Sequence, residues 1–128
     1  AASYGAVTNL ATLLQDYQNR YLDDQINAGW QRLIGSTDRH VLEAASPMGN
    51  LDSIDAPLLL IHGDEDLTVP PSQSRRMTQA LETADKAVEL IILDKGDHWL
   101  SESETRLAAL KAFSRFVDRH IGAGQPAP

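Results

Sequence analysis

The 128-residue chain contains no cysteine, few basic residues and no long hydrophobic run. Without cysteine it can form no disulfide, no thiolate metal site and no cysteine nucleophile. Its 11 lysines and arginines stand against 18 aspartates and glutamates, so the net charge is −7. That balance argues against a nucleic acid or an anionic membrane surface as partner, because both attract basic patches. No apolar run approaches the roughly 18 residues of a membrane span.

The remaining composition is that of a globular protein, with 42% hydrophobic and 23% charged residues. The length suits one domain, which we expect over residues 1–121. Residues 122–128 offer only small residues, glutamine and prolines, and we expect a flexible tail there. The absence of cysteine leaves the cellular compartment open.

Two short apolar runs, residues 57–62 and 88–93, are typical of strands buried on both faces of a parallel sheet. Between them, Pro71 suits the first turn of a helix because its missing N–H costs nothing there. Apolar residues recur at helical spacing up to Ala84. The segment therefore predicts a right-handed strand–helix–strand unit.

The C-terminal segment predicts a helix over residues 102–120. Ser101-x-x-Glu104 has the pattern of a capping box. The apolar positions at helical spacing are Leu107, Leu110, Phe113, Val117 and Ile121.

The first third of the chain is less regular. It predicts a short strand within residues 1–7 and helices over 9–18, 24–34 and 38–45. The whole pattern predicts an α/β fold with three α/β/α layers and a small parallel sheet.

Polar clusters follow both predicted strands of the unit. Asp64, Glu65 and Asp66 come after the first, and Asp97 and His98 come after the second. Because parallel strands end at the same edge of a sheet, a carboxylate from one loop can meet His98 from the other. That pair is the acid–imidazole half of a hydrolytic triad, in which the acid fixes the imidazole tautomer and stabilises the imidazolium.

Two other interpretations of these residues remain open. Asp66 can serve as a turn former, and His62 is expected to be a structural histidine at a strand end. His62, Asp64, Asp66 and His98 together could also ligate zinc or manganese, although their spacing matches no known metal motif. We expect no cofactor.

Several segments resemble one family. His62-Gly-Asp-Glu-Asp66-Leu-Thr-Val-Pro70 resembles the HG-x-x-D-x-x-V-P segment of the prolyl oligopeptidase family of serine peptidases, and Gln73-Ser74 resembles the Q-S pair that follows it. Gly96-Asp97-His98 resembles the family's G-x-H. Similar segments also lie at Ser46-Pro47 with Ile54-Asp-Ala-Pro57, and at Tyr4-Gly-Ala-Val-Thr-Asn-Leu10.

The resemblance covers residues 1 to about 121 and implies the C-terminal half of an α/β-hydrolase fold. It implies that Asp66 is the triad acid and His98 the triad base. The HG-x-x-D pattern also occurs in esterases and dienelactone-hydrolase-like enzymes, so a peptidase is favoured and an esterase is the alternative. The expected substrate is a peptide or a small ester.

The sequence contains no G-x-S-x-G nucleophile elbow. The nearest candidate is Ser3, but Ala1 stands where the elbow needs its first glycine, and no strand can precede Ser3. We therefore expect a hydrolase portion that supplies the acid and base, lacks the nucleophile, and is inactive alone.

The same resemblance leaves one sheet edge unpaired, which predicts a homodimer formed through that edge. The alternative function is a free-standing α/β binding module that retains a relic Asp–His pair.

Overall fold

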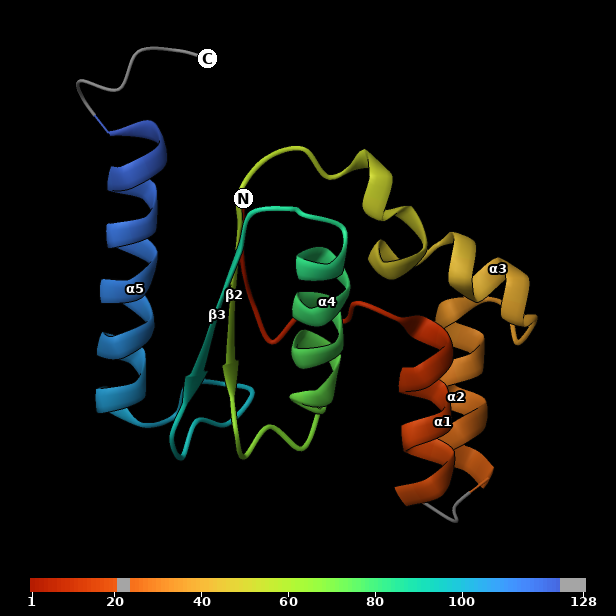
Figure 1. Ribbon diagram of the computed structural model, residues 1–128. Coiled ribbons are helices and arrows are strands. Elements are labelled where there is room, and N and C mark those ends of the chain that lie inside the picture. Colours follow the sequence, from red (N-terminus) through yellow and green to blue (C-terminus); the bar gives the residue numbers. More distant parts are fainter. Residues whose placement is uncertain (21–23, 123–128) are drawn as a thin grey trace.

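The computed structural model describes residues 1–20 and 24–122 (Figure 1). Three parallel strands form one sheet: β1 (Ala2–Tyr4), β2 (Leu58–Gly63) and β3 (Val88–Leu93). Their order is β1-β2-β3, with Leu60 of β2 opposite Ser3 on one side and Leu90 on the other. The predicted small parallel sheet is confirmed.

Helices cover both faces of the sheet (Figure 1). On one face, Ala109, Ala112 and Phe116 of α5 (Ser103–Ile121) pack on Leu59 and Ile61 of β2. On the other face, Met77 and Leu81 of α4 (Ser72–Thr83) pack on Leu60 of β2. Alternate residues of β2 thus face opposite layers, which explains why its sequence is apolar throughout.

A helical extension lies beyond α4 (Figure 1). It consists of α1 (Leu10–Arg20), α2 (Asp24–Ile34) and α3 (Arg39–Ala44), all near their predicted places. Asp38 caps α3 by accepting backbone N–H groups. A 3₁₀ helix at Pro47–Ser53, which the sequence did not predict, leads back to the sheet.

The structure corrects the predicted start of the C-terminal helix. The predicted capping box is wrong, because Glu102 is the N-cap and makes no side-chain hydrogen bond to the helix. The Ser101 N–H instead donates to Asp97 Oδ1 at 2.9 Å.

The spacing of large apolar residues predicted this helix but not its buried face. The buried residues of α5 are Thr105, Ala109, Ala112 and Phe116. Leu107, Leu110 and Phe113 are 52%, 65% and 48% exposed. Small side chains let the helix approach the sheet closely, and this turns the larger ones away from the described core.

Of the predicted tail, Gly122 is the C-cap of α5, and residues 123–128 lie outside the described residues. Among the described helices, none combines the length and apolar character needed to cross a membrane.

Candidate active site

The loops that follow β2 and β3 lie against each other at the carboxyl edge of the sheet. A Cβ atom at Gly63 would fall 2.0 Å from the Gly96 carbonyl oxygen, so only glycine fits there. The Glu65 N–H donates to the same Gly96 carbonyl at 3.0 Å. This close backbone approach brings the loop of Asp66 beside the loop of His98.

The two predicted site residues meet. Asp66 Oδ2 lies 2.8 Å from His98 Nδ1. Asp66 Oδ1 accepts the backbone N–H groups of Thr68 at 2.9 Å and Val69 at 2.8 Å. The carboxylate is buried, whereas the His98 side chain is 24% exposed.

This geometry sets the protonation pattern of His98. A carboxylate only accepts hydrogen bonds, so Nδ1 carries the proton that faces Asp66. Within residues 1–20 and 24–122, Nε2 of His98 makes no hydrogen bond. An imidazole held in this way can accept a proton at Nε2 while the buried carboxylate stabilises the resulting charge.

Gly5 lies against one side of the Asp66–His98 pair. Its φ of +56° lies in the left-handed region, and a Cβ there would lie 3.2 Å from His98 Nδ1 and 3.3 Å from Asp66 Oδ2. Both the conformation and the space therefore favour glycine. The Tyr4–Leu10 resemblance pointed to this segment but not to its contact with the pair.

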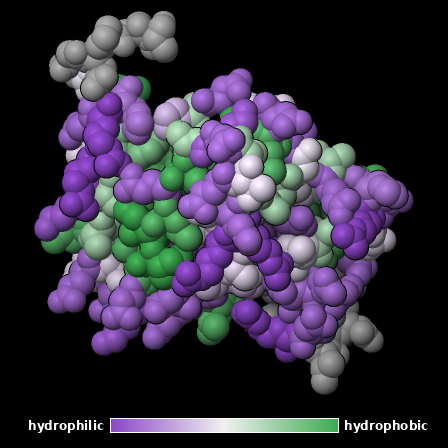
Figure 2. Space-filling view, in the orientation of Figure 1, coloured by the Kyte–Doolittle hydropathy of each residue, from purple (hydrophilic) through white to green (hydrophobic). Residues whose placement is uncertain are grey.

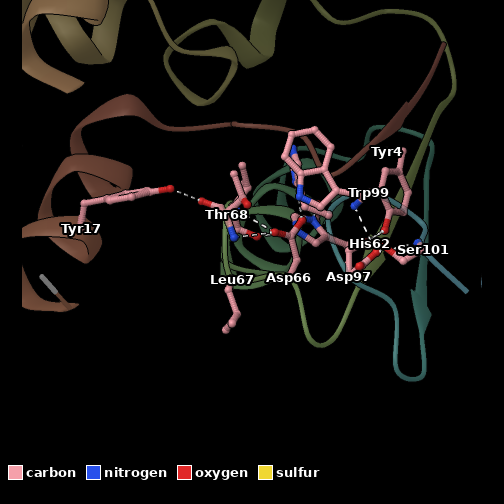
Figure 3. A network of polar contacts seen from close by, with 12 residues as sticks. Tyr4, Tyr17, His62, Asp66, Leu67, Thr68, Asp97, Trp99 and Ser101 are labelled. Atoms are coloured by element: carbon pink, nitrogen blue, oxygen red, sulfur yellow. Dashed lines mark hydrogen bonds and ion pairs between the residues drawn. The ribbon is translucent and has the colours of Figure 1, made fainter. Parts of the chain in front are cut away.

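Tyr4 anchors the His98 loop by donating its hydroxyl hydrogen to the Asp97 carbonyl (Figure 3). Burial, followed by the negative charges of Asp66 and Asp97, raises the pKa of Tyr4 to about 12. The Asp97 carboxylate accepts the backbone N–H groups of Trp99 at 3.1 Å and Ser101 at 2.9 Å. Hydrogen bonding from Ser101 is the main cause that lowers the pKa of Asp97.

The first helix holds the Asp66 loop from the outside. Tyr17 donates its hydroxyl hydrogen to the Thr68 carbonyl at 2.7 Å (Figure 3). Arg20 donates to the Leu67 carbonyl at 2.7 Å. Sequence reasoning missed both contacts, because only the tertiary fold brings α1 to this loop.

Gln73 fixes the segment between β1 and α1. Its buried Oε1 accepts the backbone N–H groups of Thr8 at 3.1 Å and Asn9 at 2.8 Å, and its Nε2 donates to Thr12 Oγ1 at 2.9 Å. One side chain of α4 thus holds the loop that begins at Gly5. The Q-S resemblance marked this residue without a reason for it.

The other candidates lie apart from the pair or serve different roles. Asp64 and Glu65 are exposed, as expected for solvated loop acids. Ser3 lies inside β1, paired with Leu60, and not at a strand–helix turn. Among the described residues, no group of three or more histidines and acids has the arrangement of a metal site.

A parallel sheet between helical layers, with an acid and a histidine in the loops after neighbouring strands, defines the α/β-hydrolase class. Comparison with known protein families shows which family of this class the chain belongs to. A model of the prolyl oligopeptidase family matches residues 1–124, and the chain belongs to that family.

Two curated relatives are similar over part of their length. Dipeptidyl-peptidase 5 of Porphyromonas endodontalis is 26% identical over 98 residues, covering 77% of this chain and 14% of that protein. Human acylamino-acid-releasing enzyme is 32% identical over 78 residues, covering 61% of this chain and 11% of that enzyme. The chain therefore spans a small share of these relatives.

A solved structure shows the same fold. The acylaminoacyl peptidase of Pyrococcus horikoshii superposes with a TM-score of 0.79 at 24% identity. The match covers 99% of this chain and 20% of that one.

Proposed function

We propose that Asp66 and His98 are the acid and base of a serine peptidase site whose nucleophile is supplied by polypeptide outside these 128 residues. The observation that carries the proposal is the 2.8 Å contact between Asp66 Oδ2 and His98 Nδ1, with Nε2 left open. Membership of the prolyl oligopeptidase family favours peptide substrates over simple esters.

The proposed chemistry is proton transfer through His98. Nε2 takes the proton from a serine hydroxyl as its oxygen attacks the scissile carbonyl. The imidazolium, stabilised by Asp66, then gives that proton to the leaving amine as the carbon–nitrogen bond breaks. Water repeats the cycle on the acyl-enzyme, which releases the acid and restores the serine.

The sequence favours an external nucleophile. It has no G-x-S-x-G elbow, and the oxyanion hole of this class uses a backbone N–H from the elbow and another from an earlier loop. Ser3 belongs to a paired strand. We therefore expect the 128-residue chain to bind no transition state and to hydrolyse nothing by itself.

We also propose where the remaining hydrolase polypeptide docks. A groove of about 350 Å³ runs between β1 and α5 and is lined by Ala2, Tyr4, Ile61, Ala109, Leu110 and Phe113. Figure 2 shows an apolar patch beside α5 on the opposite, viewed side of the sheet, so apolar surface is exposed there as well. Beside the groove, β1 forms one edge of the described sheet, with unpaired backbone groups along its outer side. The occupant we favour is hydrolase polypeptide, because four-fifths of the Pyrococcus structure lies outside the match.

In the isolated chain, a second copy covers the same groove and edge, which gives a homodimer. Light scattering across a concentration series tests this. A dimer whose population falls in Leu110→Glu supports the interface, and a strictly monomeric mass at high concentration contradicts it.

A chimaera tests the proposed activity. Residues 1–122 replace the matching part of the Pyrococcus acylaminoacyl peptidase, and hydrolysis of a peptide anilide and an activated ester is followed. We expect turnover that His98→Ala reduces by at least about a thousandfold. A folded chimaera whose rate is the same with and without His98 would contradict the proposal and favour a binding module with a relic pair.

A further inference from the structure

The buried histidine at the end of β2 contacts the site without belonging to the proposed proton path. His62 is fully buried. Its Nε2 lies 2.8 Å from the Val69 carbonyl oxygen and 3.3 Å from Asp66 Oδ2. Its Nδ1 lies 2.6 Å from Ser74 Oγ, in the first turn of α4.

These partners select one tautomer. The Val69 carbonyl and the Asp66 carboxylate only accept hydrogen bonds, so Nε2 must carry the proton. Nδ1 is then an acceptor, and the Ser74 hydroxyl donates to it. In this Nε2–H form every polar atom of the buried ring has a partner, as burial requires.

The consequence falls on Asp66. Its Oδ1 accepts two backbone N–H groups, from Thr68 and Val69. Its Oδ2 lies 2.8 Å from His98 Nδ1 and 3.3 Å from His62 Nε2. His62 acts on the other side of Val69: its Nε2–H donates to the Val69 carbonyl at 2.8 Å, whereas its 3.3 Å separation from Asp66 Oδ2 is a close contact and not a hydrogen bond. His62 therefore holds the residue whose backbone N–H fixes Asp66 Oδ1.

We propose that His62 is a positioning residue: its Nε2–H, oriented by Ser74, holds the Val69 backbone that donates to Asp66 Oδ1, and so keeps Asp66 Oδ2 in line with His98 Nδ1. The chain of contacts runs from α4 through His62, Val69 and Asp66 to His98. This inference rests on the proposed function for its catalytic meaning, but its geometry concerns the isolated chain. The alternative is a purely structural role, in which His62 connects β2 to α4 and has no effect on the position of Asp66.

A matched pair of variants separates the two interpretations. Glutamine places an N–H donor near the position of imidazole Nε2, so His62→Gln keeps the donor to the Val69 carbonyl and loses the Ser74 contact. Asparagine places an acceptor near the position of Nδ1, so His62→Asn keeps the Ser74 contact and loses the donor to the Val69 carbonyl. Only the positioning role predicts that these variants differ at His98.

The first measurement is NMR of the imidazole nitrogens in the unmodified 128-residue chain. We expect His62 to carry its proton on Nε2 and His98 on Nδ1. A proton on His62 Nδ1 would overturn the inference.

The second measurement is the exchange of the His98 Nδ1 proton with water in each variant. We expect His62→Asn to speed it about tenfold, as for a buried carbonyl left without its donor, while the exchange of β2 and β3 amides stays unchanged. His62→Gln should stay near the parent rate. Equal effects in both variants, or none in His62→Asn, would contradict the positioning role.

If His62→Asn does not fold, the variant Ser74→Ala tests the positioning role instead. Removing the hydroxyl that orients His62 should speed exchange at His98 about fivefold, and an unchanged rate would overturn the inference. None of these readouts requires a nucleophile. An inactive chimaera with the expected exchange pattern would therefore count against the proposed function alone.

In an active chimaera, His62→Asn should lower kcat about tenfold and leave KM unchanged, because the lost contact acts on the base and not on the substrate. His62→Gln should restore most of the rate. A change confined to KM would contradict the role.

Discussion

The polar groups at the carboxyl edge of the sheet are hydrogen-bonded, whereas the face between β1 and α5 leaves apolar side chains exposed. At the edge, Asp66 is buried and both of its oxygens have donors. On the face, Leu110 and Phe113 are 65% and 48% exposed beside β1, which is paired on one side only. The contrast teaches that neighbouring loops of this chain suffice to hold the acid–imidazole pair, whereas the exposed apolar face is where we propose that further polypeptide docks.

The largest expected effect on stability is at the carboxyl edge of the sheet. Asp66→Ala leaves the buried N–H of Val69 and the half-buried N–H of Thr68 without an acceptor, and we expect the free energy of unfolding to fall by about 3 kcal/mol in urea denaturation. Asp64→Ala, at an exposed position of the same turn, is the control and should change it by under about 0.5 kcal/mol. Equal losses would show that the edge is not held by Asp66.

The next effect tests the backbone approach that joins the two loops. Gly63→Ala places a Cβ 2.0 Å from the Gly96 carbonyl oxygen, and the loops must separate. We expect a loss of about 2 kcal/mol in the free energy of unfolding and a weakened Asp66–His98 contact. Gly29→Ala, in α2 with open space around it, should instead stabilise the chain by about 1 kcal/mol.

A smaller effect concerns Tyr4. Removing its hydroxyl in Tyr4→Phe frees the Asp97 carbonyl and should cost about 1 kcal/mol at neutral pH.

The same residue predicts a dependence on alkaline pH. Folding raises the pKa of Tyr4 from 10.0 to about 12, so the folded chain holds this proton more tightly than the unfolded chain. The resulting stability is complete below pH 10 and is lost as the pH rises from 10 to 12. Urea denaturation at pH 8, 10 and 11 should show a shallower decline for Tyr4→Phe, and parallel declines would contradict the assignment.

The smallest effect on stability is expected on the face between β1 and α5. Leu110→Glu should change the free energy of unfolding of the monomer by under about 0.5 kcal/mol while weakening self-association. Leu33→Glu, at a 77% exposed position of α2, is the control and should leave association unchanged. A large loss of monomer stability in Leu110→Glu would mean that this face is already packed.

The sequence predicted the parts that depend on local pattern. Two apolar runs with a helix between them forced parallel neighbours, and the loops after them brought Asp66 to His98. The remaining support came from tertiary contacts that no spacing encodes, such as Gly5 against the pair and Gln73 on the Thr8 backbone.

The sequence did not indicate which face of α5 is buried. Large apolar side chains usually mark a core face, but here Ala109 and Ala112 face the sheet. Leu110 and Phe113 line the groove for which we propose a partner, and Leu107 is exposed outside that groove. The spacing of large apolar residues therefore located the helix but not the side that packs on the sheet.

Labelling of the nucleophile with a fluorophosphonate tests the central claim most directly, because the reagent phosphonylates a serine activated by its histidine, with loss of fluoride. We predict no adduct on the 128-residue chain. In the chimaera we predict one adduct, on the serine of the supplied elbow, and its loss in His98→Ala. An adduct on Ser3 or another serine of the isolated chain would contradict the account, as would labelling of the chimaera that does not depend on His98.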